Sequence, residues 1–518
     1  MALAAETAKT RQTPATVVVV QPVKLALPIR RYVRMWDGAE YCFFLDSALN
    51  EGRLGRFSFV GGDPAAVLMF RRQAGHVLGA PGEVTVIHHR AADGLPIEPP
   101  RMRRFAADPF LLLHRWLAHR SPPQQTESAQ PHEVPFGGGL VGYLGYELLH
   151  FIENVPPAAR RDVDLPDGCL MVVDSLLAHD HDTNRSYVCA LGQADHADQA
   201  RSRARRTAAA LLDRVRHFEP DAPGEPTGPQ AVAQGPVGAF FDRDGYGELV
   251  RTAKDHIAAG DAFEICLTHR LDVKYTGDPW ALYCHLRRIN PAPFAAYLRL
   301  PEATILCASP ERFLRLRPDG WAEARPIKGT RPRGLTPQQD RCLRDELAHS
   351  EKDRAENAMI VDLLRNDLGR VCRFGTIGVE NAMSIEAYAS VFQMVSTVRG
   401  RLRPECDAVD LLRACFPGGS MTGAPKVEAM KIINRLEPVA RGVYSGAIGY
   451  FDAGGGMDLN IVIRTILMQN GRAYLNVGGA VVADSDPLAE YDETMDKAQA
   501  LLQALRGEHR VRPCRSDV

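Results

Sequence analysis

The sequence predicts an α+β fold, and three observations lead to that class. Apolar segments interrupted by glycine, which are typical of β-strands, follow one another without the regular strand–helix–strand alternation of a doubly wound sheet. Stretches with helical periodicity lie between these segments and close the chain. The chain has 518 residues, of which 45% are hydrophobic, so it can bury a large core and form more than one lobe.

Residues 1–217 are predicted to form an N-terminal lobe that consists mainly of strands. A first strand is expected at 16–20, a hairpin-like pattern at 41–69 and a glycine-rich apolar stretch at 136–147. Strands are also expected at 170–177 and 185–191. The polar run between them contains His179 and His181. Two histidines at this spacing can ligate a metal, but a short polar run between apolar strands is more typical of a hairpin turn.

The clearest boundary in the chain is a Pro/Gly-rich linker at residues 218–236, after an exposed helix at 194–217. The second region, 237–507, contains the strongest patterns. It should start with a helix at 243–259 and end with a helix at 487–505. The basic segment 508–518 is predicted to be a frayed tail.

The composition excludes several functional classes. Lys and Arg number 62 and Asp and Glu 63, so the charge balance indicates neither a nucleic-acid partner nor an anionic membrane partner. The eleven cysteines are scattered singly and form no CxxC pair, a pattern that suits a reducing cytosol. No apolar run reaches membrane-spanning length, and the start of the chain lacks the layout of a signal peptide. We therefore expect a cytoplasmic globular protein.

Lys328 is the most unusual residue of the second region. It lies in the extended segment RPIKGTRPRG, residues 325–334, between Ile327 and Gly329. A lysine on a strand usually extends its ammonium group to water. The alternative is a neutral amine nucleophile, which requires burial or a neighbouring cation to lower the pKa of the lysine. The segment by itself leaves both interpretations open.

Two predicted helices each carry a pair of carboxylates at i,i+3. In the helix at 351–368, Glu356 falls within the apolar stripe and Asp353 lies at its edge. In the helix at 487–505, Glu490 and Glu493 share a face with Lys497. A buried ion pair would explain Glu356 equally well, because an interior carboxylate is costly without a partner. If the two helices are neighbours, the carboxylates favour a Mg²⁺ site over a zinc or copper site.

A glycine-rich turn, GGSMTGAPK at 418–426, precedes an amphipathic helix. It is not a P-loop, because Ala424 and Pro425 separate the last glycine from the lysine. Backbone N–H groups at such a helix start suit a carboxylate as well as a phosphate. Tyr444 and Arg464 are candidates to add a phenol and a charged clamp for the same ligand.

Seven segments of the second half resemble the chorismate-utilising enzymes, and most closely their aminodeoxychorismate synthase component I branch. They occur in the order of that family, between about residues 237 and 506, and segments of the first half resemble its N-terminal lobe. The seven segments are SPERF, PIKGTRPRG, AENAMIVDLLRNDLGR, GGSMTGAPK, YSGAIGYF, NIVIRT and AEYDETMDKA.

The resemblance implies a fold of two large antiparallel sheets packed face to face, with helices outside and both halves of the chain contributing, as in anthranilate synthase component I. It also implies that Lys328 attacks C2 of chorismate, while Glu311 protonates the departing C4 hydroxyl. Ammonia then adds at C4 and expels the lysine. Glu356 and Glu493 match Mg²⁺ ligands, with Asp353 and Glu490 close behind them. The implied substrate-binding positions are Tyr444, Arg464, Gly478, Gly479 and Lys497.

Departures from the family pattern restrict the function further. Glu264 stands where isochorismate and salicylate synthases have a lysine that activates water, and Gln393 stands where many relatives have histidine. Anthranilate synthases have alanine where this chain has Lys328. Anthranilate synthase component I nevertheless remains the rival enzyme. A relative that binds chorismate without catalysis is the rival from another class.

Ammonia is expected to come from a separate glutaminase subunit. A class I glutaminase needs a cysteine on a sharp Gly-x-Cys-x-Gly turn, and the nearest approach to that motif is at Cys169. There the second glycine is missing and the surrounding sequence is typical of a strand.

Overall fold

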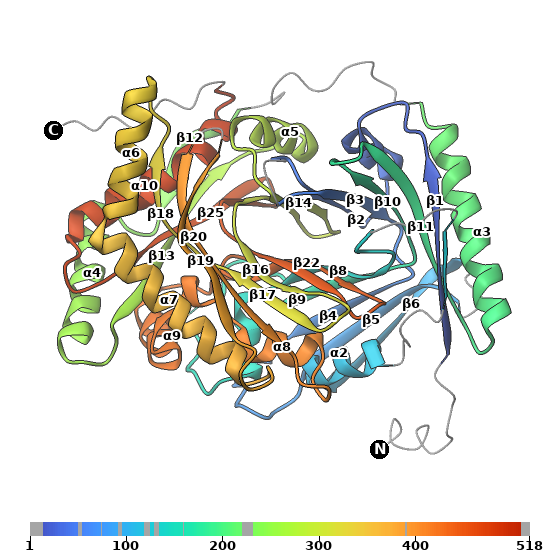
Figure 1. Cartoon of the computed structure of the whole chain (residues 1–518), viewed down its shortest axis with the longest axis horizontal. Helices are drawn as coiled ribbons and strands as arrows, with labels where there is room; N and C mark the ends of the chain where they lie inside the picture. Colours follow the sequence, from blue (N-terminus) through green and yellow to red (C-terminus); the bar gives the residue numbers. More distant parts are fainter. Residues whose placement is uncertain are drawn as a thin grey trace.

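Two large β-sheets form the centre of the molecule (Figure 1). The computed structural model describes residues 14–49, 54–73, 75–91, 96–118, 125–128, 134–158, 160–219, 232–388 and 391–508. Strands from before and after the predicted linker enter both sheets, and every pairing is antiparallel except that of β1 with β7. This architecture confirms the predicted α+β class and the shared sheets.

The first sheet has thirteen strands. In spatial order they are β12 (Gln234–Ala239), β13 (Glu264–Lys274), β25 (Arg472–Val481), β24 (Thr465–Gln469), β15 (Thr304–Ser309), β14 (Phe294–Arg299), β2 (Cys42–Asp46), β3 (Phe57–Gly62), β10 (Ser175–Asp180), β11 (Arg185–Ala194), β1 (Ala15–Val23) and β7 (Gln125–Ser128), with β21 (Gly423–Ala424) paired to β13.

The second sheet has twelve strands. In spatial order they are β18 (Ile327–Pro332), β20 (Val391–Arg401), β17 (Trp321–Arg325), β16 (Arg312–Leu316), β23 (Met457–Ile461), β22 (Ala447–Asp452), β8 (Gly139–Leu144), β9 (Gly168–Val173), β4 (Ala66–Arg71), β5 (Gly82–Arg90) and β6 (Pro96–Ala107), with β19 (Gly378–Ala387) paired to β20.

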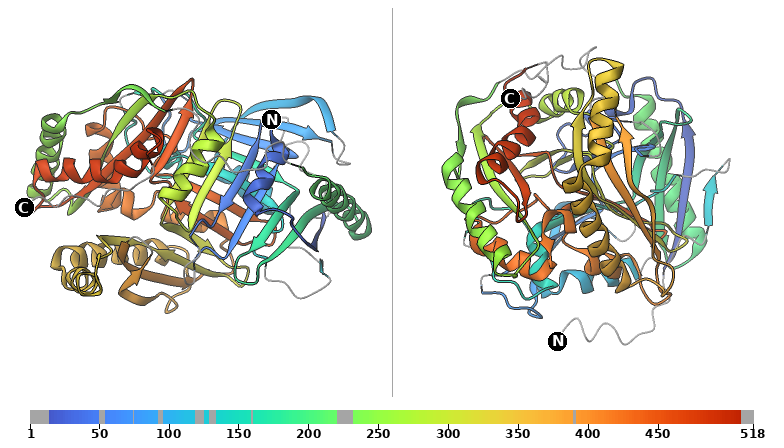
Figure 2. Two further views of the ribbon diagram at one scale, coloured as in Figure 1. Left: turned by 90° about the horizontal axis from the view of Figure 1, so that it is seen from above. Right: turned by 60° about the vertical axis from the view of Figure 1, so that its left-hand side comes forward.

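Helices cover the outer faces of both sheets (Figures 1 and 2). They are α2 (Pro109–Ala118), α3 (Ala197–Arg216), α4 (Arg243–Ala258), α5 (Pro279–Ile289), α6 (Pro337–His349), α7 (Glu351–Gly369), α8 (Ala408–Cys415), α9 (Lys426–Leu436) and α10 (Pro487–Leu505), with the short 3₁₀ segments η1 (Ile29–Trp36), η2 (Tyr146–Phe151) and η3 (Gly419–Met421). Within the described residues, none of the helices combines the length and apolar character needed to cross a membrane.

The apolar core has a layer between the sheets and a layer on each outer face. Phe43 and Ile305 of the first sheet pack in one buried cluster with Val141 and Ile448 of the second, which shows that the sheets lie face to face. A second cluster joins the first sheet to η1, α3, α5 and α10, and a third joins the second sheet to α2, α7 and α8. Alternating side chains of each strand therefore serve both layers.

Most elements lie where the sequence predicts them. The helices at α3, α4, α7 and α10 are confirmed, and α10 has the predicted bounds. The hairpin-like region is only partly a hairpin, because β2 pairs with β3 but β4 joins the other sheet. Residues 220–231 of the predicted linker and 509–518 of the predicted tail lie outside the described residues. The division of the chain into residues 1–217 and 237–507 stays a prediction.

The predicted hairpin turn between β10 and β11 is present but starts at His181, because His179 and Asp180 belong to β10 and pair with β11. The Nδ1 atom of His179 lies 2.8 Å from the Ser186 hydroxyl, and the Nε2 atom of His181 lies 2.8 Å from the Ser58 hydroxyl. Both rings thus have hydrogen-bond partners within the sheet, in agreement with a turn.

The carboxylate-bearing helices α7 and α10 lie at the same end of the molecule, in two separate layers (Figures 1 and 2). Helix α7 packs on β18 and β20 of the second sheet, and α10 packs on β25 of the first sheet. Ser350 caps α7 by accepting a hydrogen bond from the Asp353 amide, and Asp486 caps α10 ahead of Pro487. These caps therefore set where each helix starts, and with it the positions of the two carboxylates that the helix carries.

Candidate active site

Lys328 is buried at the centre of the candidate site, with 8% of its surface exposed. Its Nζ donates a hydrogen bond of 2.8 Å to Oε1 of Glu264 and lies 3.7 Å from Oε2 of Glu356. The side chain therefore does not extend to water. Burial favours the neutral amine, but the carboxylates of Glu264 and Glu356 outweigh burial and raise the pKa of Lys328 above its usual value.

The charged form of Lys328 differs from the neutral amine that the sequence interpretation requires of a nucleophile. That interpretation requires burial or a neighbouring cation to lower the pKa of the nucleophile. Lys497, a cation of the predicted site, has its Nζ paired with Glu493 at 2.7 Å and donates to the Gly478 carbonyl at 3.0 Å. The amine of Lys328 is thus a cation, and a neutral nucleophile requires offsetting the carboxylates around it.

Glu311 is a buried carboxyl between β15 and β16, and it faces the same site. The hydroxyl of Ser420 donates a hydrogen bond of 2.9 Å to Oε1 of Glu311. Burial raises the pKa of Glu311 to about 7, although the Ser420 hydrogen bond and the charge of Lys328 act in the opposite direction. A carboxyl with this pKa is half protonated near neutrality, as a general acid requires.

Glu356 and Glu493 face the site from the two helices. Burial raises the pKa of Glu356, although the nearby charge of Lys328 opposes this shift. Burial also opposes ionisation of Glu493, but Lys497 outweighs burial and lowers its pKa. The charges of Lys328 and Lys352 act on both carboxylates, so the two glutamates lie near the same two lysines.

Asp353 and Glu490, which are predicted to lie close behind the two metal ligands, differ in their surroundings. Asp353 lies against Gly329 and pairs with Arg331 at 3.2 Å, so its carboxylate is already engaged by an arginine. Glu490 is 4% exposed; its Oε1 accepts a hydrogen bond of 2.6 Å from Ser485. A Cβ at Gly479 would come within 2.9 Å of Oε2 of Glu490, so glycine there leaves room for this carboxylate.

The site contains carboxylate oxygens that are free to bind a cation such as Mg²⁺. Among the described residues, the buried carboxylate oxygens without a hydrogen-bond donor are Oε2 of Glu264 and Oε2 of Glu490, and both belong to this site. Unsatisfied carboxylate oxygens fit a cation. In the described part of the chain, no three of the site carboxylates come within 4.8 Å of one another. In proteins Mg²⁺ commonly takes one or two carboxylates and completes its octahedron with water and substrate.

Tyr444 and Arg464 are two further residues of the predicted site, and they lie near each other. Burial lowers the pKa of Arg464 and raises that of Tyr444, and each side chain lies in the electrostatic field of the other. No carboxylate within the described ranges forms an ion pair with Arg464. Its backbone is left-handed, at φ 49°, a strained conformation that is frequent at functional sites. A buried guanidinium without an acidic partner suits an anionic ligand.

Three residues of the site were missed in the sequence. Ser420 contacts the predicted acid, and Glu264 contacts the predicted nucleophile. Lys352 lies 3.9 Å from Glu490 and acts electrostatically on Glu356 and Glu493. Ser420 lies inside the conspicuous GGSMTGAPK segment, so that segment was the one available signal. The contact of Glu264 with Lys328 and that of Lys352 with Glu490 each join residues more than sixty positions apart in the chain.

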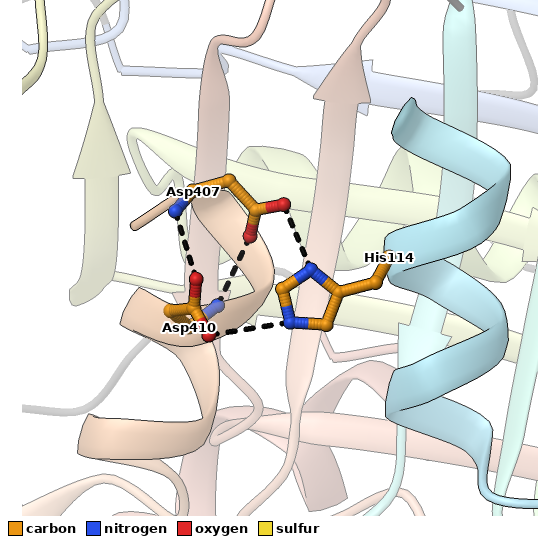
Figure 3. Close-up of side chains that lie close together, drawn as sticks. All are labelled: His114, Asp407 and Asp410. Carbon is orange, nitrogen blue, oxygen red and sulfur yellow. Dashed lines mark hydrogen bonds and ion pairs between the residues drawn. The ribbon is translucent and has the colours of Figure 1, made fainter. Parts of the chain in front are cut away.

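Three side chains of the kinds that bind metals, His114, Asp407 and Asp410, lie together outside this site, between α2 and α8 (Figure 3). Both ring nitrogens of His114 face carboxylates, Nδ1 at 2.8 Å from Asp407 and Nε2 at 3.2 Å from Asp410. The same two aspartates form a capping box at the start of α8. Their oxygens are therefore already engaged, and we assign the group to joining the two helices.

Cys169 does not have the surroundings of a glutaminase nucleophile. It lies in β9, paired on both sides with β4 and β8, and burial raises the pKa of its thiol. A catalytic thiol needs a lowered pKa and access to substrate. Cys169 thus has the properties of a core residue.

Comparisons with known proteins agree with this architecture. Residues 99–503 match the family described as chorismate binding enzyme. Aminodeoxychorismate synthase from Streptomyces griseus is 42% identical over 97% of this chain and 66% of its own length. The chain thus spans less than two thirds of that relative. Aminodeoxychorismate synthase component 1 from Klebsiella aerogenes is 38% identical over 94% of this chain and 100% of its own length.

A solved structure supports the same relationship. The crystal structure of anthranilate synthase component I from Streptococcus pneumoniae superposes with a TM-score of 0.71 and 29% identity, covering 87% of this chain and 93% of the other. The family match extends over most of the catalytic region and part of the N-terminal lobe, and it includes every predicted site residue. The chain therefore belongs to the chorismate binding enzyme family.

Proposed function

We propose that this chain is an aminodeoxychorismate synthase component I, which converts chorismate and ammonia to 4-amino-4-deoxychorismate. The observation that carries the proposal is the buried Lys328, whose amine lies among the carboxylates Glu264, Glu356 and Glu493 and near the acid Glu311. Anthranilate synthase component I remains the alternative enzyme, since its fold is the same. The resemblance places alanine at the matching position in that branch, so Lys328 favours the aminodeoxychorismate reaction.

In the proposed first step, the neutral amine of Lys328 forms a bond to C2 of chorismate. The ring double bonds shift and the C4–O bond breaks, while Glu311 gives its proton to the departing hydroxyl, which leaves as water. In the second step, the nitrogen of ammonia bonds to C4, the double bonds shift back and the C2–N bond to Lys328 breaks. Lys328 leaves as a free amine, and the ammonium group formed at C4 returns one proton to the Glu311 carboxylate, which leaves the new amine on the product and restores the acid.

The substrate carboxylates would be held by Arg464, Tyr444, Lys497 and the backbone at Gly478 and Gly479. Glu356 and Glu493 would hold Mg²⁺, which when bound would orient a substrate carboxylate and offset its negative charge. A Glu356 carboxylate that held Mg²⁺ would attract the Lys328 proton less. The pKa of Lys328 would then fall, and a larger fraction of its amine would be neutral. Glu311 is already about half protonated at neutral pH and needs no such change.

The test of this proposal is product identification. The purified chain, incubated with chorismate, Mg²⁺ and ammonium at alkaline pH, should form 4-amino-4-deoxychorismate without releasing pyruvate. Alkaline pH supplies ammonia in its neutral, nucleophilic form. Chromatography with mass spectrometry separates this product from anthranilate. Anthranilate and pyruvate as the main products would instead establish the alternative enzyme.

The reaction should also depend on the protonation of Glu311. Because the acid form of Glu311, whose pKa is about 7, and the neutral form of Lys328, whose pKa is raised, are both required, the rate at a constant concentration of free ammonia should rise with pH up to about 7 and level off above it. Asp452 is a matched control, a half-buried carboxyl with a pKa of about 6 at the end of β22. Asp452→Asn should keep the change of slope near pH 7. A wild-type rate that continues to rise above this pH in proportion to the neutral amine would contradict the acid role.

Glutamine should be a nitrogen donor only when a glutaminase subunit is present. The reason is that the nearest candidate nucleophile, Cys169, is a buried core residue. The measurement compares product formation from glutamine and from ammonium, with and without an added glutaminase. Use of glutamine by the isolated, homogeneous chain would show that a partner is unnecessary.

A further inference from the structure

Glu264 has an unusual position for a buried carboxylate. It is the first residue of β13 and is 0% exposed. Its Oε1 accepts the hydrogen bond from Lys328, whereas its Oε2 has no donor within the part of the chain that the structure describes. A buried acceptor without a partner is costly, so its retention calls for a reason other than stability.

Two buried carboxylates in structural ion pairs elsewhere in this chain accept hydrogen bonds at both oxygens. Glu437, which is 4% exposed, accepts hydrogen bonds at Oε1 from Arg441 and the Thr268 amide, and at Oε2 from Arg441. Asp46 likewise uses both oxygens, toward Arg287 and Tyr283. The pair of Glu264 with Lys328 differs from these, because one oxygen is committed to the amine and the other is left without a donor.

The backbones that carry the two residues differ in regularity. Strand β13 pairs with β25 in continuous register from Ile265 to Lys274, and Glu264 itself pairs with Ala424 of β21. Strand β18 is irregular at the lysine, since its register against β20 shifts between Ile327 and Thr330. Gly329, next to the lysine, has a left-handed φ of 79°. Glu264, on the regular strand β13 of the first sheet, thus holds the end of the Lys328 side chain, which comes from the irregular strand β18 of the second sheet.

Lys328 has a second acceptor within reach, because Oε2 of Glu356 lies 3.7 Å from its Nζ. Glu356 is also a proposed metal ligand, and a carboxylate engaged with a cation is a poorer partner for an ammonium group. Glu264 is not one of the proposed metal ligands, and its Oε1 lies closer to Nζ, at 2.8 Å.

We infer that Glu264 is the positioning residue of Lys328: its carboxylate holds Nζ away from Glu356 and over the carbon that the amine attacks. The inference rests on the proposed function, since it assigns a place to the nucleophile of that reaction. Glu264 forms no bond to substrate in this assignment. It restricts the amine to one location, and a small misplacement of a reacting atom has a large effect on rate.

The experiment compares E264Q and E264A. Glutamine retains an oxygen that accepts the hydrogen bond from Nζ, whereas alanine removes the anchor. The chain is mixed with chorismate and Mg²⁺ without ammonia, and the adduct on Lys328 is followed by mass spectrometry over time. We expect E264A to form the adduct on the order of 100-fold more slowly than wild type. E264Q should stay within about tenfold of wild type. The KM for chorismate should change little in either variant.

A matched control separates positioning from loss of a buried ion pair. Asp367 is a 4%-exposed carboxylate of α7 that pairs with Lys426, another lysine–carboxylate pair. D367N should reduce thermal stability but leave the rate of adduct formation unchanged. If D367N slows the adduct as much as E264A does, the effect is general destabilisation and the inference is overturned.

Crystal structures of the unliganded variants give a readout that does not depend on activity. In E264Q, Nζ of Lys328 should stay at residue 264, and in E264A it should move toward Glu356. Unchanged placement of Nζ in E264A, or adduct formation at the wild-type rate, would overturn the inference. If the wild-type chain forms no adduct at all, the proposed covalent function fails, and the position of Nζ still decides whether Glu264 is the anchor.

Discussion

Replacing Lys328 by alanine should lower the formation of 4-amino-4-deoxychorismate by roughly three orders of magnitude or more. The amine is the proposed nucleophile, and the remaining groups supply only binding, the acid and the metal carboxylates. The variant also leaves the buried Glu264 without its partner, which costs about 3–5 kcal/mol of stability. Rates should therefore be compared at a temperature where both proteins remain folded, as circular dichroism shows.

The same variant has a second expected outcome, which concerns the identity of the product. Alanine leaves space at C2, where ammonia can attack directly and shift the residual product toward the anthranilate precursor. Lys328→Gln is the matched variant, because its amide fills the space and can donate to Glu264 but cannot form the covalent bond. It should lose activity without the shift in product.

Mass spectrometry tests the covalent step independently. Wild-type protein given chorismate and Mg²⁺ without ammonia should accumulate an adduct that maps to Lys328, and Lys328→Gln should not. An alanine variant with wild-type activity, together with a wild-type protein that forms no adduct, would remove the covalent mechanism while the family membership stands.

Glu356→Gln and Glu493→Gln should each weaken Mg²⁺ binding by at least about tenfold and nearly abolish turnover. Each substitution removes one anionic oxygen donor from a hard cation that is bound by few protein ligands. The fold should survive, because Glu356 is half-buried with a raised pKa and its replacement relieves a buried charge. Calorimetric titration with Mg²⁺ measures the affinity directly, and unfolding curves measure stability.

Controls on the same helices separate ligation from general charge effects. Asp362→Asn removes an exposed carboxylate of α7 that pairs with Arg365, and Mg²⁺ affinity should not change. Asp353→Asn and Glu490→Gln should have smaller effects than the two ligand variants, because Asp353 is engaged by Arg331 and Glu490 by Ser485. Unchanged Mg²⁺ affinity in both Glu356→Gln and Glu493→Gln would exclude the proposed site.

The sequence by itself determined the fold class and the positions of the helices that carry the site. Helices α7 and α10 could be predicted because their apolar periodicity and their N-caps are local properties of the chain. The same periodicity indicated that Glu356 points inward, and in the structure it is half-buried. The order of the seven family segments identified Lys328 and Glu311 as candidate groups, and both are buried near the same carboxylates.

The tertiary structure decided which groups these residues contact. Asp353 and Glu356 are equivalent as an i,i+3 pair, yet Asp353 contacts Arg331 and Glu356 contacts Lys328. Lys328 meets Glu264, 64 residues away on the other sheet, and this contact makes the amine a buried cation. Periodicity reports which face of an element is buried. The partner found there depends on how two sheets pack, and that is set by long-range contacts which no local pattern contains.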